Sequence, residues 1–176
     1  IKGINQKRKK MSEEMGKIAL NTLNECNFNV CYDPSFHEGM IGIVAGKIMQ
    51  KTKRPSVVFA RNQDRLKGSV RSVPNVDLHK FFMGFEDILL NFGGHEMAAG
   101  IEIMEKDYKK FTDLVNKKSQ ELEFVEETKE FIKVDPMEVT IDALNQLEQF
   151  APFGKGFESP LFMIKSTIHR KLVLKN

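Results

Sequence analysis

The sequence has few cysteines, few histidines and no long apolar run, and these shortages exclude several classes of protein. Its 176 residues include two cysteines and four histidines. Cys26 and Cys31 cannot supply a four-cysteine zinc site, and they indicate reduced packing residues of the kind found in a cytoplasm. No apolar stretch approaches the ~18 residues that suggest a membrane span. The basic segment 1–10 is not followed by the apolar core of a secretory signal. The composition therefore favours a cytoplasmic protein without membrane contact.

The chain has enough apolar residues to form a core, and its charge is unevenly distributed. Hydrophobic residues make up 41% and charged residues 29%, which fits one domain plus an appendage. Residues 1–80 hold 15 Lys and Arg against 7 Asp and Glu, giving +8, whereas residues 81–176 hold 12 against 17, giving −5. A basic half of this kind attracts polyanions such as nucleic acid. An evenly solvated surface is the alternative that net charge leaves open.

Apolar residues recur with alternating helix and strand periods over the first 122 residues. Ile41, Val44 and Ile48 recur at helical spacing, whereas the run Val57–Phe59 is typical of a strand buried on both faces. The expected elements are a helix over 5–24, a strand over 27–32, a helix after His37–Gly39, strands over 57–59 and 66–72, a helix from Asp77 to Leu89, a strand over 100–104 and a helix over 107–122. This alternation predicts an α/β fold.

The segment Phe92–Gly100 places two glycines and a histidine at one predicted turn. Glycine permits positive φ and close backbone approach, and successive N–H groups in such a turn can bind an anion. Gly93, Gly94 and His95 are therefore candidates for an anion-binding loop in which the imidazole donates a further hydrogen bond. The alternative is a tight turn that enters a buried strand, with His95 merely capping it.

A second candidate anion-binding segment is Gly68–Ser72, which reads as the end of a short strand. Arg71 can grip a phosphate through two parallel charge-assisted hydrogen bonds, and Ser69 and Ser72 add neutral donors. Strand alternation puts Ser69 and Arg71 on one face. Surface arginines are often merely solvated, so this segment alone is compatible with a surface loop.

The C-terminal part is predicted to form a separate unit. Glutamates accumulate over 121–130 without a matching apolar stripe, which indicates a boundary. A strand is expected over 131–136, followed by a short helix that Thr140 caps and that ends at Pro152–Gly156. Residues 161–174 then provide further expected strands.

Several spaced blocks in one order resemble the DHH phosphoesterases, and within them the RecJ-type single-strand DNA exonucleases. The blocks are FHEGMIGIVA at 36–45, Arg54-Pro55 before the strand 56–60, GSVRS at 68–72, Asp77-Leu78-His79, FGGHEMAAG at 92–100 and PFGKG at 152–156. The resemblance implies a DHH-associated domain with a mixed β-sheet flanked by helices. It also implies a connector helix over 1–24, the substrate-binding domain over 25–125, and a linker plus the truncated beginning of an OB-type nucleic-acid-binding domain over 126–176.

The resemblance implies an activity for which this chain holds only part of the machinery. RecJ-like enzymes digest single-stranded DNA from 5′ to 3′ in repair and recombination, with two Mn or Mg ions held by an N-terminal Asp-His-His domain. No Asp-His-His motif occurs here. We therefore expect no catalytic residue and no metal ligand in this chain. Single-stranded DNA is the expected substrate partner, and a helicase or single-strand-binding protein is a possible partner of the full-length enzyme.

The same resemblance suggests roles for individual residues. Ser69, Arg71 and Ser72 would take the terminal phosphate of a single strand. The residues Gly93, Gly94 and His95 would line the same cleft, facing the metal ions across the gap between domains. Weaker candidates are His37, whose position before a helix also fits a cap, and Arg170, which a solvated strand explains as well.

Two other functions stay open at this point. A DHH-family oligoribonuclease or cyclic-dinucleotide phosphodiesterase would share the glycine-histidine segment, but it would lack the connector over 1–24 and the Pro152–Gly156 element. A non-catalytic single-strand-binding module is the second alternative.

Overall fold

The computed structural model describes residues 2–23, 26–124, 130–154, 156–165 and 167. The chain separates into two compact units, residues 1–125 and 126–176. No helix in the described part of the chain is both long enough and apolar enough to cross a membrane.

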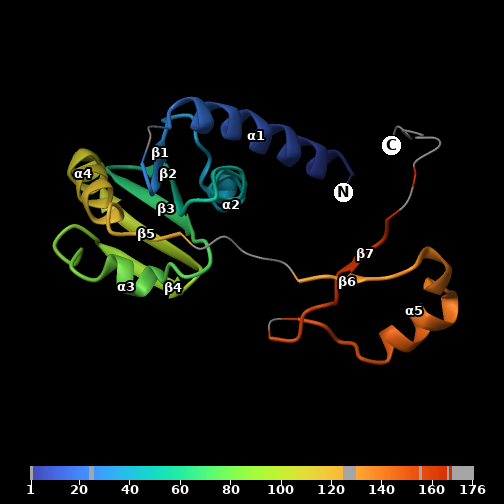
Figure 1. The fold of residues 1–176 in the computed structure, drawn as a ribbon. Helices are drawn as coiled ribbons and strands as arrows, with labels where there is room; N and C mark the ends of the chain where they lie inside the picture. The colour runs from blue at the N-terminus through green and yellow to red at the C-terminus, as the bar shows by residue number, and fades with distance from the viewer. Residues whose placement is uncertain (1, 24–25, 125–129, 155, 166, 168–176) are drawn as a thin grey trace. The chain divides into compact units, whose positions relative to one another are not determined.

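The first unit is built around a mixed five-stranded sheet, which confirms the expected α/β fold (Figure 1). The strands are β1 (Asn29–Tyr32), β2 (Ser56–Asn62), β3 (Arg65–Arg71), β4 (Asn91–His95) and β5 (Ala98–Met104). Their order across the sheet is β1-β2-β3-β5-β4, in which only β1 and β2 are parallel. The sheet therefore has β1 at one edge and the β4–β5 hairpin at the other.

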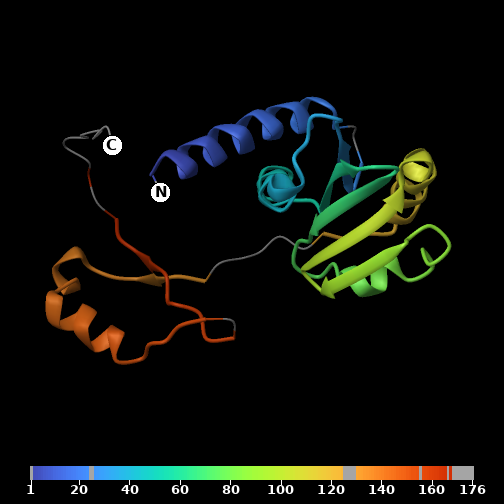
Figure 2. The same cartoon turned by 180° about the vertical axis from the view of Figure 1, so that it is seen from behind.

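On one face of this sheet α2 (Ile41–Thr52) packs over β2 and β3, and α1 (Lys2–Asn21) packs against α2. The single turn η1 (Glu38–Met40) leads into α2. Val44, Ala45 and Ile48 of α2 are fully buried against Val58 of β2 and Ala19 of α1. Figure 2 shows α2 packed on the sheet with α1 beside it. The helical spacing of α2 thus predicts its buried face correctly.

The opposite face carries the larger, aromatic core. It is covered by α3 (Leu78–Phe82) and α4 (Tyr108–Ser119), and the single turn η2 (Glu105–Asp107) leads into α4. Phe59 of β2 contacts Phe111 of α4 edge to face at 5.3 Å between ring centroids, and Phe28 stacks on Phe81 at 4.7 Å. Such pairs add to the burial of large apolar rings. The aromatic residues of 78–85 therefore serve the core.

Two local predictions are wrong. The helix that begins after Asp77 ends at Phe82 instead of Leu89, because Gly84 adopts φ +88° and the chain turns there. Phe85 and Ile88 are nevertheless buried, from a turn instead of a helix. Residues 93–95 form the end of β4 instead of a loop, and the hairpin turn comes afterwards, at residues 96–97.

The second unit has little regular structure. Its elements are β6 (Ile132–Lys133), η3 (Pro136–Glu138), α5 (Ile141–Glu148) and β7 (Phe162–Met163), with β6 parallel to β7. The Thr140 hydroxyl caps α5 by accepting a hydrogen bond from the Ala143 amide at 3.1 Å, as predicted. Residues 168–174 of the predicted later strands lie outside the described residues.

Candidate phosphate-binding groove

The strand register arranges polar and small residues in three rows across β3, β5 and β4. The rows are Arg71–Ala98–His95, Ser69–Gly100–Gly93 and Lys67–Glu102–Asn91. All nine lie on the face that α2 covers only beside β2 and β3, because their alternate neighbours Val70, Ala99 and Ile101 face the aromatic core. A groove of about 630 Å³ lies over these rows, with Gly42 of α2 and Glu38 of η1 along one wall.

Arg71 and Ser69 form the polar centre of the groove. The Arg71 guanidinium donates to the Ser69 hydroxyl oxygen at 3.0 Å and to the Val70 carbonyl at 2.8 Å. Both acceptors are uncharged, so neither neutralises the guanidinium. These bonds fix the direction of the planar group while leaving further N–H donors for an oxyanion. The predicted placement of Ser69 and Arg71 on one face is correct.

Gly42 brings the first turn of α2 against this centre. A Cβ at position 42 would lie 3.1 Å from Arg71 Nη2 and 3.2 Å from Ser69 Oγ. Only glycine lets the helix approach so closely without displacing either polar group. The first turn of a helix also carries unpaired N–H groups and a partial positive charge. An anion held by Arg71 therefore gains a second favourable field from α2.

Gly93 and Gly94, which are neighbours in β4, are glycines for different structural reasons. Nothing lies within 4 Å of a Cβ placed on Gly93, which leaves the groove floor open. A Cβ on Gly94 would lie 2.4 Å from the Ala98 carbonyl oxygen, so the hairpin excludes any side chain there. The Gly94 carbonyl accepts a hydrogen bond from His79 Nε2 at 3.1 Å, and the His79 ring contacts Phe92 edge-on.

The far row of the groove is ionic and largely self-compensated. Lys67 donates to Glu38 at 2.7 Å, and Asn62 donates to the other oxygen of the same carboxylate at 3.3 Å. The hydrogen bond from Lys67 lowers the pKa of the Glu38 carboxyl and raises the pKa of Lys67. Glu102 adds a second carboxylate, which lies 3.8 Å from Arg65. The charge of the groove is therefore positive at Arg71 and balanced or negative around Glu38.

Not every predicted site residue lines the groove. His95 lies in the Arg71 row at the solvent-exposed end of β4. Ser72 is 1% exposed and donates to the Val76 carbonyl at 2.6 Å, so it orders the turn after β3. The imidazole of His37 accepts a hydrogen bond from the Gly39 amide and caps η1. Arg170 lies outside the described residues.

Sequence reasoning missed several groove residues, namely Gly42, Lys67, Asn91, Gly100 and Glu102. The strand alternation that places Ser69 and Arg71 on one face also places Lys67 there, so the sequence could have predicted Lys67 as a groove residue. Asn91, Gly100 and Glu102 depend on which strands are neighbours, and Gly42 depends on the packing of α2 on the sheet. Both are fixed by tertiary structure.

The described residues do not form a metal site. No group of three or more His, Cys, Asp and Glu side chains among them is arranged to hold an ion. The carboxylates of the groove are committed to lysine and arginine partners. The donor set of the described residues therefore does not fit a divalent metal.

The fold belongs to a known class of domain. Residues 24–121 match the DHHA1 domain, so the chain is a member of that family. Residues 132–176 match the RecJ OB domain. The chain therefore combines the DHHA1 domain with the RecJ OB domain, and RecJ proteins are among its relatives.

Its relatives include RecJ proteins from distant bacteria. The single-stranded-DNA-specific exonuclease RecJ of Escherichia coli is 29% identical over 92% of this chain and 31% of its own length. That of Bacillus subtilis is 24% identical over 96% of this chain and 23% of its own. The crystal structure of RecJ in complex with Mn²⁺ from Thermus thermophilus gives a TM-score of 0.77 at 29% identity, covering 91% of this chain and 24% of that one. The chain thus spans less than a third of these relatives.

Proposed function

We propose that the groove over β3, β5 and β4 binds the 5′-terminal phosphate of single-stranded DNA for a RecJ-like exonuclease. The observation that carries this proposal is the Arg71 guanidinium, which is oriented by two neutral acceptors and faces an open glycine floor beside the first turn of α2. Ser69 adds a hydroxyl, and His95 stands in the same cross-strand row as Arg71. Gly93 and Gly100 let the sugar-phosphate chain approach the strand backbone.

In this proposal the groove binds the substrate, and hydrolysis requires a separate catalytic domain. The proposed full-length enzyme digests single strands from 5′ to 3′ in DNA repair and recombination, with two divalent metal ions in a DHH domain. Solved RecJ structures contain Mg²⁺ or Mn²⁺, which supports that choice of metal. We propose a cytoplasmic location, and helicase or single-strand-binding proteins as partners of the full-length enzyme. This chain alone is expected to be inactive as a nuclease.

The match to the RecJ OB domain favours this function over the other DHH activities, because an oligoribonuclease or cyclic-dinucleotide phosphodiesterase is not expected to carry that domain. A purely binding role differs only in lacking the catalytic domain. The nuclease and the purely binding module would use the same groove, so substitutions in the groove test its role in either case.

Arg71→Ala tests the proposal. We expect the preference of the chain for 5′-phosphorylated over 5′-hydroxyl oligo(dT) to fall about ten- to a hundredfold, since a charge-assisted contact contributes about 1.5 to 3 kcal/mol. Arg71→Lys should restore part of the preference, because a point charge lacks the planar fork. Fluorescence anisotropy on the two oligonucleotides provides the measurement.

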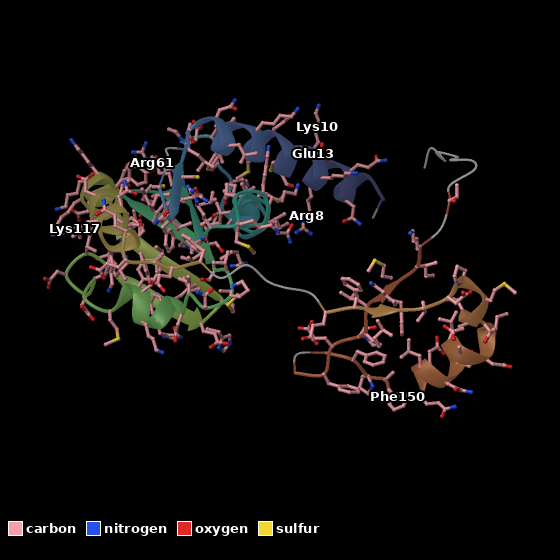
Figure 3. All side chains as sticks on the ribbon, viewed as in Figure 1. Arg8, Lys10, Glu13, Arg61, Lys117 and Phe150 are labelled. Atoms are coloured by element: carbon pink, nitrogen blue, oxygen red, sulfur yellow. The ribbon has the colours of Figure 1, made fainter. Side chains whose placement is uncertain are left out.

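Arg61→Ala is the matched control. Arg61 lies near the end of β2, pairs with Glu105 at 3.0 Å and is outside the groove (Figure 3). The Arg61→Ala substitution removes the same charge as Arg71→Ala. It should leave the preference for 5′-phosphorylated over 5′-hydroxyl oligo(dT) unchanged. If folded Arg71→Ala keeps the wild-type preference, Arg71 is not the ligand of the terminal phosphate.

A further inference from the structure

The groove has a pronounced difference in charge along β3. Arg71 and Lys67 point to the same face four residues apart, which separates their positions by about 13 Å along the strand. Arg71 donates to neutral acceptors, whereas Lys67 is held by Glu38 at 2.7 Å. Glu102 stands next to Lys67 in the adjacent strand. The positive charge available to a ligand is therefore concentrated at the Arg71 end.

A polyanion responds differently to the two ends. A phosphate at Arg71 meets an uncompensated cation. A phosphate further along a strand that continued over β3 would meet the Lys67–Glu38 and Arg65–Glu102 pairs, in which each cation already contacts a carboxylate, and a carboxylate beside a phosphate opposes binding. A groove with this charge distribution binds a phosphate at Arg71 and offers little net positive charge to phosphates further along the strand.

We propose that Glu38, with Glu102, is a specificity-determining barrier that restricts the groove to the end of a strand. Glu38 neutralises Lys67, so a strand can place its terminal phosphate at Arg71 but gains no net charge attraction from laying its backbone along β3. This inference rests on the proposed function of the groove. It assigns to the FHEGMIGIVA segment, through Glu38, a role in discriminating chain ends from chain interiors.

The direct test is Glu38→Gln, which removes the negative charge while keeping an oxygen that can accept from Lys67. We expect tighter binding of 5′-hydroxyl oligo(dT), because internal phosphates can then reach Lys67. The ratio of the dissociation constants of the hydroxyl and phosphate oligonucleotides should fall about two- to fivefold, the range of a single exposed charge interaction. The salt dependence of hydroxyl-strand binding should also steepen, because more phosphates are contacted.

Glu14→Gln is the matched control for net charge. Glu14 pairs with Lys10 on the exposed surface of α1, from which Lys10 projects (Figure 3). The substitution changes the charge of the chain by the same amount outside the groove. It should leave the ratio within about twofold of wild type, since exposed charges beyond a Debye length are screened.

Lys67→Met provides an independent test of the barrier. The barrier model expects the end preference to persist or increase, because a lysine already neutralised is no phosphate ligand in the wild type. A loss of phosphate-strand binding as large as that of Arg71→Ala would show instead that Lys67 binds substrate, and would overturn the inference.

The outcomes separate the two proposals. If Arg71→Ala abolishes the end preference but Glu38→Gln leaves it unchanged, the groove binds the terminal phosphate and the barrier is refuted. If the wild-type chain does not distinguish the two strand ends, both proposals fail. A lowered ratio in Glu38→Gln, with Glu14→Gln unchanged, supports the barrier.

Discussion

At the scale of single residues, Gly42 shows how a position in a helix can serve a binding site at the expense of stability. Glycine inside a helix is less stable than alanine by about 0.5 to 1 kcal/mol. Position 42 keeps glycine where a methyl group would meet Arg71 Nη2 and Ser69 Oγ at 3.1 and 3.2 Å. Gly46, one turn later in α2, would have nothing within 4 Å of an added Cβ. The two glycines therefore allow binding and stability to be separated within one helix.

Gly42→Ala should weaken discrimination of the 5′-phosphate, because the added methyl crowds Arg71 Nη2 and Ser69 Oγ and makes them shift by a few tenths of an ångström. Gly46→Ala should raise the free energy of unfolding by up to about 1 kcal/mol and leave binding unchanged. Denaturant titration and oligonucleotide anisotropy on both variants distinguish these effects. Equal binding by the two variants would show that the close approach at Gly42 has no consequence for the ligand.

At the scale of elements, hydrophobic periodicity predicted the helices and strands that depend on local burial. It missed the features that depend on which strands are paired. The spacing of α2 and the apolar run of β2 follow directly from the residues that they bury. Residues 93–95 look like a loop because glycine is common in turns, yet β5 supplies a hydrogen-bonding partner that makes them a strand. The phosphate-binding candidates Ser69 and Arg71 follow from alternation, whereas Gly42 and Glu38 enter the groove only through packing of α2 and η1 on the sheet.

Gly93→Ala and Gly94→Ala form a matched pair within β4. Gly94→Ala should lower the free energy of unfolding by about 1 to 3 kcal/mol, because its Cβ would overlap the Ala98 carbonyl. Gly93→Ala should be close to wild type in stability, since its Cβ has free space, and should affect only ligand binding. Thermal melts of both variants test the assignment, which is wrong if Gly93→Ala is the less stable of the two.

At the scale of the whole molecule, the sheet buries groups that resist ionisation. Burial raises the pKa of the Cys31 thiol from 9.0 to about 12, and burial also raises the pKa of Tyr108 from 10.0 to about 12. The folded protein then keeps protons that the unfolded chain releases. Stability contributed by these neutral groups is fully present below pH 9 and is lost as the pH rises toward 12.

Cys31→Ala should flatten the decline in unfolding free energy between about pH 9 and 10, where each differentially held proton changes stability by about 1.4 kcal/mol per pH unit. Urea titrations at several pH values provide the slope. Cys26→Ala, at a half-buried thiol, is the control and should keep a steeper decline. Identical slopes in the two variants would mean that Cys31 resists ionisation in the folded protein no more than Cys26, whose pKa burial also raises.

The bond between His79 and the Gly94 carbonyl bears on how the protein behaves at high concentration. An edge strand offers free amide and carbonyl groups on which another chain can extend the sheet, and such extension leads to aggregation. In β4 the carbonyl of Gly94 is already occupied by an imidazole, and the Phe92 ring packs against that imidazole. The edge nearest the groove is thereby blunted, so a glycine-rich strand can remain open to a ligand without becoming a template for self-association.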